Sequence, residues 1–285
     1  MTNIKAFGCS TCLHYDRETK ECHCQNDIVK TVDSYGDTIC SQHTNKQNGK
    51  LTGGYKVIKE RQKVWFTSDL HFCHANILYF HPERREHFGI SLEELQSDKV
   101  SAIEKMNDAL IRQWNETVKR EDTIYFLGDF CLANKEETEK ILRQLHGKKF
   151  LIIGNHDKSL KGLERYFVDV AQIKEAKFTN NQFPFIPVSE PFCVEMCHFP
   201  LLTWNRRQNG TCMVHGHAHD SITSVNDSSL ELRVDVGYDC KRWNYQFVEL
   251  EDLYNYFVGI REKLGCKTFK EYTEKLIAER NGVKG

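Results

Sequence analysis

Short strand-like runs recur along the chain, and nearly every one is followed at once by a carboxylate, an amide or an imidazole. The runs are "KVWFTS", "DTIYFLGD", "KKFLIIGN", "FCVEMCHF", "TCMVHGHAH", "LELRVDVG" and "NYQFVEL". Their β-branched and aromatic residues are typical of strands. Because ligands gather outside the strand ends of open α/β sheets, we expect polar residues that are distant in the sequence to converge there.

Helix-like stretches separate these runs. Apolar residues at helical spacing predict one or two amphipathic helices between the first two runs, a third helix further on, and a surface helix over residues 267–280. The residues are Leu92, Leu95, Ile103, Met106, Leu110, Ile111 and Trp114 for the first group, and Ile141, Leu142 and Leu145 for the second. Because strands and helices alternate, the predicted fold class is α/β.

Charge and hydropathy exclude several partners. The chain has 39 Lys and Arg against 40 Asp and Glu, a net charge of −1, so it offers no general attraction to long nucleic acid or to an anionic membrane. No apolar run approaches the roughly 20 residues that span a bilayer, and the amino terminus lacks the apolar core of a secretory signal. We therefore expect a cytoplasmic protein with no membrane partner.

Composition shifts predict three segments. Residues 41–54, "SQHTNKQNGKLTGG", are polar and glycine-containing, which is typical of a linker. We expect a Cys-rich module with its linker at residues 1–48, the main α/β domain at residues 56–258, and a helical extension at residues 259–285.

The Cys-rich module is expected to need a metal. Five of the 12 cysteines fall within the first 40 residues, and so short a segment with few large apolar side chains cannot fold on hydrophobic burial alone. We predict one structural zinc ion held by Cys9, Cys12, Cys24 and Cys40, with Cys22 as the substitute for Cys24. A disordered, thiol-rich tail is the alternative, and an iron–sulfur site is less favoured by the spacing.

The residues that follow the strand-like runs form a consistent chemical set. Any one of them is common turn chemistry, but turns give no reason for carboxylate, amide and imidazole to recur in succession. Such oxygen and nitrogen donors suit divalent Mn, Fe, Zn or Ni better than calcium or a thiolate cluster. The set comprises Asp69, His71, Asp129, Asn155, His156, Asp157, His198, His217 and His219.

The order of these motifs resembles the calcineurin-like metallophosphoesterase superfamily, in its bacterial and phage-like subgroup. The resemblance covers residues 64–219 and rests on Asp69-x-His71, Gly128-Asp129, Gly154-Asn155-His156-Asp157, His198 and Gly216-His217-x-His219. It implies a four-layer αββα sandwich with two divalent metal ions on loops at one sheet edge. It also implies hydrolysis of phosphoric esters by a hydroxide that bridges the metals.

The resemblance assigns a role to each matching position. Asp69, His71 and His219 would hold the first metal, Asp129 would bridge the two, and Asn155, His198 and His217 would complete the second. His156 would protonate or stabilise the leaving oxygen. Asp157 would orient His156 or its loop.

His74 has two interpretations of equal weight. The superfamily subgroup retains a second histidine in its first motif, so His74 could contact the substrate phosphate. It could equally be a helix-start residue that bonds to nearby backbone.

The phosphate-binding residues of protein phosphatases are missing. Those members of the superfamily follow Gly-Asp with a further Asp and an Arg, whereas residues 130–132 here read Phe-Cys-Leu. A protein phosphatase role is therefore disfavoured. Arg206 and Arg207, which follow His198, could supply the missing contact, although loop arginines are often only solvated.

Two functions are compatible with this sequence. The first is a hydrolase of phosphodiesters or phosphomonoesters that acts on a small, nucleotide-like substrate. The second is a binding protein that has kept the fold without catalysis and recruits a partner through its Cys-rich head. We favour the first, because a lapsed enzyme is expected to lose several metal ligands and the complete set is present.

Overall fold

The computed structural model describes residues 31–32, 38–39, 61–280 and 282, and the chain divides into two units at residues 61 and 62. In the first unit, β1 (Thr31–Val32) pairs antiparallel with β2 (Thr38–Ile39). The predicted zinc ligands Cys9, Cys12, Cys24 and Cys40, and the alternative Cys22, lie outside the described residues. The zinc module and its boundary therefore stay predictions.

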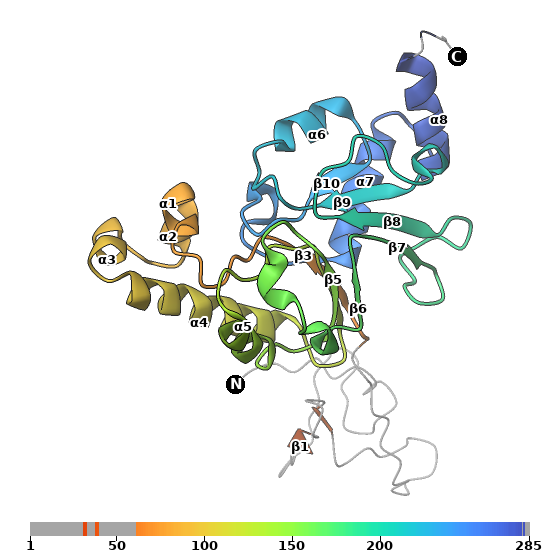
Figure 1. Ribbon diagram of the computed structural model, residues 1–285. Coiled ribbons are helices and arrows are strands. Elements are labelled where there is room, and N and C mark those ends of the chain that lie inside the picture. Colours follow the sequence, from red (N-terminus) through yellow and green to blue (C-terminus); the bar gives the residue numbers. More distant parts are fainter. Residues whose placement is uncertain (1–30, 33–37, 40–60, 281, 283–285) are drawn as a thin grey trace, which may run out of the picture. The chain divides into compact units, whose positions relative to one another are not determined.

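The second unit contains a five-stranded sheet in the order β11-β3-β4-β5-β6, of which β3, β5 and β6 are labelled in Figure 1. All neighbours are parallel except β11, which is antiparallel to β3. The strands are β3 (Val64–Thr67), β4 (Thr123–Phe126), β5 (Lys148–Ile152), β6 (Asp169–Ala171) and β11 (Val248–Glu249). Four of the five fall within predicted strand-like runs, and β6 was not expected.

A four-stranded sheet follows the order β10-β9-β8-β7. Strands β8, β9 and β10 are parallel, and β7 is antiparallel to β8. The strands are β7 (Ile173–Phe178), β8 (Phe192–Cys197), β9 (Cys212–His215) and β10 (Arg233–Asp235). Both sheets are thus mixed, and β7 is the member that the sequence did not predict.

One of the two large hydrophobic cores lies between the two sheets. Phe66 of β3 packs in one cluster with Val194 of β8 and Val214 of β9, all fully buried. Two helices add to this cluster, α7 (Leu250–Glu262) and α8 (Phe269–Arg280). The predicted boundary between residues 258 and 259 therefore falls inside α7, on a helix whose buried Phe257 and Ile260 belong to the same core.

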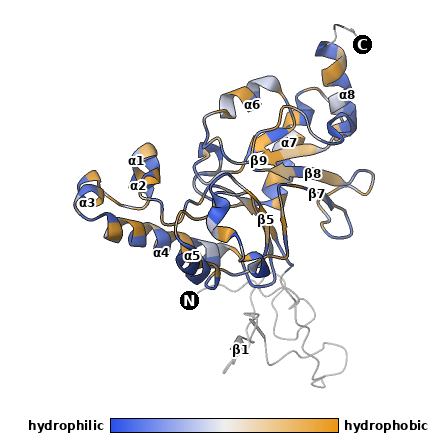
Figure 2. Ribbon diagram, in the orientation of Figure 1, coloured by the Kyte–Doolittle hydropathy of each residue, from blue (hydrophilic) through white to orange (hydrophobic). Residues whose placement is uncertain are grey.

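Helices cover the other face of the five-stranded sheet. The longest is α4 (Lys99–Thr117), which begins at Asp98, whose carboxylate accepts a hydrogen bond from the backbone N–H of Ser101. Its buried residues recur every four positions, so one stripe of the helix faces the core, and apolar and polar colours alternate along it in Figure 2. The remaining helices on the chain between β3 and β5 are α1 (Ile77–Phe80), α2 (Pro82–His87), α3 (Leu92–Ser97) and α5 (Lys135–Leu142).

The outer face of the four-stranded sheet has a thinner cover. Helix α6 (Thr223–Ser229) places Asn226 against His215 of β9 and Arg233 of β10. Trp204 from the segment between β8 and β9 covers Met213. The expected arrangement of two sheets flanked by helices is confirmed. Among the described residues, no helix is both long and apolar enough to cross a membrane.

Candidate metal centre

The loops that follow β3 and β4 are joined by backbone hydrogen bonds. The N–H of Asp69 donates to the carbonyl of Gly128 at 2.9 Å, and the N–H of His71 donates to the carbonyl of Asp129 at 3.0 Å. Gly154 must be a glycine at this point, because a Cβ there would lie 2.3 Å from Oδ1 of Asp129. The loops of three neighbouring strands therefore approach as closely as their backbones allow.

Most of the predicted ligands have unusual backbone conformations. Non-glycine residues rarely adopt positive φ, and strain of this kind costs on the order of 1–3 kcal/mol at each position. The residues are Asp69 (φ 59°), His71 (50°), Asp129 (58°), His217 (67°) and His219 (43°). Because such strain gathers at functional sites, the conformations point to a site that is held in place by the surrounding structure.

The first cluster consists of Asp69, His71 and His219. The Nε2 atoms of the two histidines are 3.3 Å apart, and Oδ1 of Asp69 lies 4.0 Å from that of His71 and 3.7 Å from that of His219. This Oδ1 is buried and has no hydrogen-bond partner among the described residues. A buried, unpartnered carboxylate oxygen that faces two imidazole nitrogens fits a divalent cation.

The electrostatics of the first cluster agree with that fit. Burial raises the pKa of Asp69 to about 7, and burial also lowers the pKa of His71 well below its ordinary value. An imidazole that stays neutral is the form that binds a metal. Without a cation, burial therefore destabilises the carboxylate of Asp69 relative to its protonated form.

The second cluster consists of Asp129, His198 and His217. Nδ1 of His198 lies 2.7 Å from the carbonyl oxygen of Leu127, which can only accept, so Nδ1 carries the proton and Nε2 is left as the donor to a metal. That Nε2 is 3.0 Å from Oδ1 of Asn155. His198 therefore lies between Asn155 and the rest of this cluster, and the predicted ligand set stays a prediction.

Asp129 lies between the two clusters. Its Oδ2 is 3.7 Å from Nε2 of His71 in the first cluster and 3.6 Å from Nε2 of His198 in the second. Its Oδ1 accepts a hydrogen bond of 2.8 Å from the backbone N–H of His156. One carboxylate therefore faces both donor sets, which is the arrangement that a pair of cations requires.

The two residues predicted for catalysis on the loop after β5 differ in their surroundings. The His156 side chain is exposed, and its ring centre is 5.8 Å from that of His71. Asp157 is buried, and its carboxylate accepts hydrogen bonds from the N–H groups of Asp129, Phe130 and Gly154 at 2.7–3.0 Å. Asp157 therefore positions the two loops and leaves His156 free to face solvent.

His74 lies at the start of α1, and its predicted contact with the substrate phosphate stays a prediction. Its carbonyl accepts a hydrogen bond from the N–H of Ile77 at the start of α1. Its Nδ1 also lies 3.3 Å from Nδ1 of His71. The ring of His74 therefore fixes the orientation of a ligand histidine, so that Nε2 of His71 faces the site.

Arg206 and Arg207 do not join the clusters. Arg207 forms a two-point ion pair with Glu231, with Nε 3.0 Å from Oε2, and the N–H of Thr211 donates to the carbonyl of Arg206. Both partners precede strands β9 and β10, whereas the metal ligands follow those strands. The predicted phosphate contact is corrected, because the chain returns to the opposite end of the sheet between His198 and these arginines.

A buried network that the sequence analysis missed supports the first cluster. Arg84 of α2 is fully buried and donates from Nη1 to the carbonyl of Asp69 and to Oδ2 of Asp239, both at 3.0 Å, while Nη2 donates to the carbonyl of Leu70. Nδ1–H of His219 donates to the same Oδ2 of Asp239 at 2.7 Å. Asp239 therefore orients His219 and sets its tautomer.

The ionisable groups in this network shift one another's pKa values towards their charged forms. Burial alone would lower the pKa of His219, but its hydrogen bond to Asp239 and the nearby Asp69 raise it above the ordinary value. Burial alone would raise the pKa of Asp239, but Arg84 and His219 hold it below its usual range. Asp239 follows a strand-like run, as the predicted ligands do, and that signal was available in the sequence. Arg84, on a short polar helix, gave none.

A family comparison decides the relationship that these motifs suggest. The family model for calcineurin-like phosphoesterases matches residues 62–250. The chain belongs to the calcineurin-like phosphoesterase family. Its two His and Asp clusters are those expected of a metal site in that family.

Several proteins are similar to this family member over different shares of their length. An uncharacterized protein of Methanocaldococcus jannaschii is 34% identical over 34% of this chain and 48% of its own length, so the chain spans about half of that relative. The Gene 66 proteins of Mycobacterium phages L5 and D29 are 24% and 26% identical, over 72% and 62% of this chain and 99% and 89% of their own. A crystal structure of a protein of unknown function from Aquifex aeolicus aligns with a TM-score of 0.48 at 21% identity, over 69% of this chain and 100% of that one.

Proposed function

We propose that the chain is a phosphoesterase that uses two divalent metal ions to hydrolyse phosphodiester or phosphomonoester bonds in a small, nucleotide-like substrate. Family membership supports the reaction class. The observation that carries the proposal is the position of Asp129, whose Oδ2 lies 3.6–3.7 Å from an imidazole nitrogen of each cluster. A shared carboxylate offsets the repulsion between two cations and is needed only if both are bound.

The residues that would hold the metals follow from the two clusters. Asp69, His71 and His219 would bind one ion, and Asn155, His198 and His217 the other, with Asp129 shared. Mn, Fe, Zn or Ni fits this mixture of imidazole and oxygen donors. When bound, two such ions lower the pKa of water and neutralise charge on phosphoryl oxygens.

The chain's own groups would handle the leaving oxygen. The backbone of His156 is anchored to Asp129, while its side chain is exposed on the same side as His71. An imidazole held there can donate a proton to the leaving oxygen of the ester, or stabilise its charge. Asp157 keeps the loop in position by binding the N–H groups on either side of the site.

The proposal is tested by measuring metal content and hydrolysis together. Protein purified without added metal is subjected to elemental analysis and assayed with bis-p-nitrophenyl phosphate and p-nitrophenyl phosphate, with and without Mn. We expect two bound metal ions at this site and metal-dependent cleavage, and the better ester indicates the substrate type. Bound metal with no hydrolysis of either ester would contradict the proposal and favour a binding protein.

A further inference from the structure

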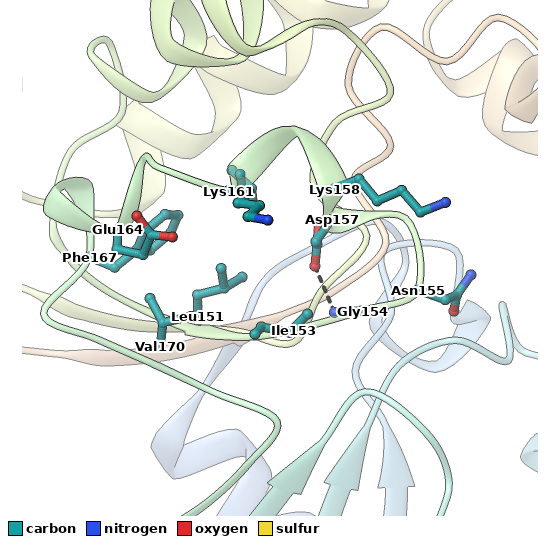
Figure 3. Close-up of a pocket in the computed structure, with 11 residues that line it drawn as sticks. Leu151, Ile153, Gly154, Asn155, Asp157, Lys158, Lys161, Glu164, Phe167 and Val170 are labelled. Carbon is teal, nitrogen blue, oxygen red and sulfur yellow. Dashed lines mark hydrogen bonds between the residues drawn. The ribbon is translucent and has the colours of Figure 1, made fainter.

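A cavity of about 280 Å³ opens on the five-stranded sheet beside the metal centre (Figure 3). Its floor is apolar and consists of Leu151 and Ile153 from the end of β5, Val170 of β6, and Phe167. Lys158 and Lys161 also line the cavity; in Figure 3 Lys161 stands above this floor, and the Lys158 side chain extends towards Asn155. Sites for whole small-molecule ligands usually measure about 300–1,000 Å³, so this cavity suits one part of a substrate.

The rim of the cavity is positively charged. Lys158 and Lys161 are exposed, and neither forms an ion pair with any residue that the structure describes. The lining also contains two carboxylates, and both accept backbone hydrogen bonds: the buried Asp157, and Glu164, which accepts one of 2.9 Å from the N–H of Gly162. Two ammonium groups without an ion pair, beside an apolar floor, match a planar or apolar group that carries an anion.

The cavity and the metal centre share one loop. Asn155 lines the cavity and also places Oδ1 3.0 Å from Nε2 of His198. Gly154 and Asp157 line it as well, joined by a hydrogen bond of 2.7 Å that Figure 3 shows. A substrate whose scissile phosphorus sits at the metals therefore has this cavity as its neighbour.

We propose that this cavity is a substrate subsite that binds the nucleoside part of a nucleotide, with a second phosphate held by Lys158 and Lys161. The apolar floor would take the base, and the lysines would take a phosphate other than the one that is cleaved. The preferred substrates would then be phosphodiesters of nucleotides that carry an additional phosphate. The inference rests on the proposed function for the place of the scissile phosphate, and on the cavity alone for the second one.

The test is an equilibrium binding measurement by calorimetry, with thymidine 3′,5′-bisphosphate as the probe and the full-length chain as the protein. The Lys158→Gln/Lys161→Gln double variant removes both ammonium groups. Lys148→Gln is the matched control, because Lys148 is also exposed but lies at the other end of β5. Each is measured alone and combined with Asp129→Asn, which separates binding in the cavity from binding at the metals.

We expect the double variant to weaken bisphosphate binding at least tenfold in both backgrounds, with no change for Lys148→Gln. Binding of thymidine should be unaffected by the lysine changes but weakened by Ile153→Asp, since Ile153 is 38% exposed in the floor. Equal affinity of the wild-type chain and the double variant for the bisphosphate would overturn the subsite.

The two proposals fail separately. If the wild-type chain with Mn cleaves no ester, yet bisphosphate binding depends on the lysines, the proposed function is wrong and the subsite stands. If bis-p-nitrophenyl phosphate is cleaved while the lysine changes leave bisphosphate binding unaltered, the subsite is wrong and the proposed function stands.

Discussion

Replacing Asp69 by asparagine should stabilise the metal-free protein while removing its ability to hold the first metal. Oδ1 of Asp69 is buried without a hydrogen-bond partner, and burial raises the pKa of the group to about 7. Asparagine has the same shape and no charge. Its amide can still accept the hydrogen bond from the N–H of His217, which now goes to Oδ2 at 2.9 Å, and its NH₂ would face His71 and His219.

The size of the effect follows from the pKa difference. Between its unfolded pKa of 3.8 and its folded pKa of about 7, Asp69 holds a proton in the folded state that it loses in the unfolded state. The free energy of unfolding of the metal-free protein therefore falls as the pH rises through this window. At about 1.4 kcal/mol per unit over roughly three units, the loss is about 4 kcal/mol above pH 7.

Urea unfolding in the presence of a chelator at pH 5 and pH 8 measures this difference. We expect Asp69→Asn to be more stable than wild type at pH 8 by up to about 4 kcal/mol, and the gain to shrink to about 1.5 kcal/mol at pH 5. Asp239→Asn is the matched control. Its partner Arg84 would remain buried and unpaired, so that variant should lose about 3–5 kcal/mol. Destabilisation of both variants alike would refute the reasoning about Asp69.

Three further predictions follow. Asp129→Asn should lose both site metals and turnover, whereas His156→Ala should keep its metals and slow hydrolysis by about 10²–10⁴-fold. Elemental analysis and kcat test this, and loss of a metal by His156→Ala would contradict its role. Arg207→Gln should cost about 1–3 kcal/mol at pH 7 without changing KM. Burial alone would raise the pKa of Glu231, but Arg207 and Arg280 hold it below its ordinary value. The stability difference between Arg207→Gln and wild type should therefore disappear as the pH is lowered through the folded pKa of Glu231. A raised KM would instead support a phosphate contact for Arg207. Cys9→Ser should release one zinc ion and leave the site metals, and unchanged zinc content would remove the zinc module.

The strands that carry the site were predictable because they are buried on both faces. All four residues of β3 and of β9 are buried, and such strands read as continuous apolar runs. β7 was missed because it lies at the edge of its sheet and reads "IKEAKF", with five of its six residues exposed or only partly buried. Its pattern carries charge where a central strand would carry valine or isoleucine.

The candidate ligands were predictable for a topological reason, which also explains why Arg207 lies away from them. A residue directly after a parallel strand must lie at the carboxyl edge of the sheet, so sequence order alone brings Asp69, Asp129 and Asn155 together. Arg207 is near His198 in sequence, but the connection to a parallel strand runs back along the sheet. Arg84 reaches the site through a fully buried side chain on a short helix, and no local sequence pattern predicts that contact.

The two clusters also determine how the sandwich is held at one edge. Each cluster draws ligands from both sheets, since the aspartates and Asn155 follow strands of the five-stranded sheet, and His198, His217 and His219 follow strands of the four-stranded one. A bound ion would therefore add a cross-link between layers that otherwise meet through apolar side chains and a few hydrogen bonds, such as that from the N–H of His217 to Asp69. Amide hydrogen exchange would detect this directly, as slower exchange at residues 68–72 and 215–219 when the metals are present than when a chelator has removed them.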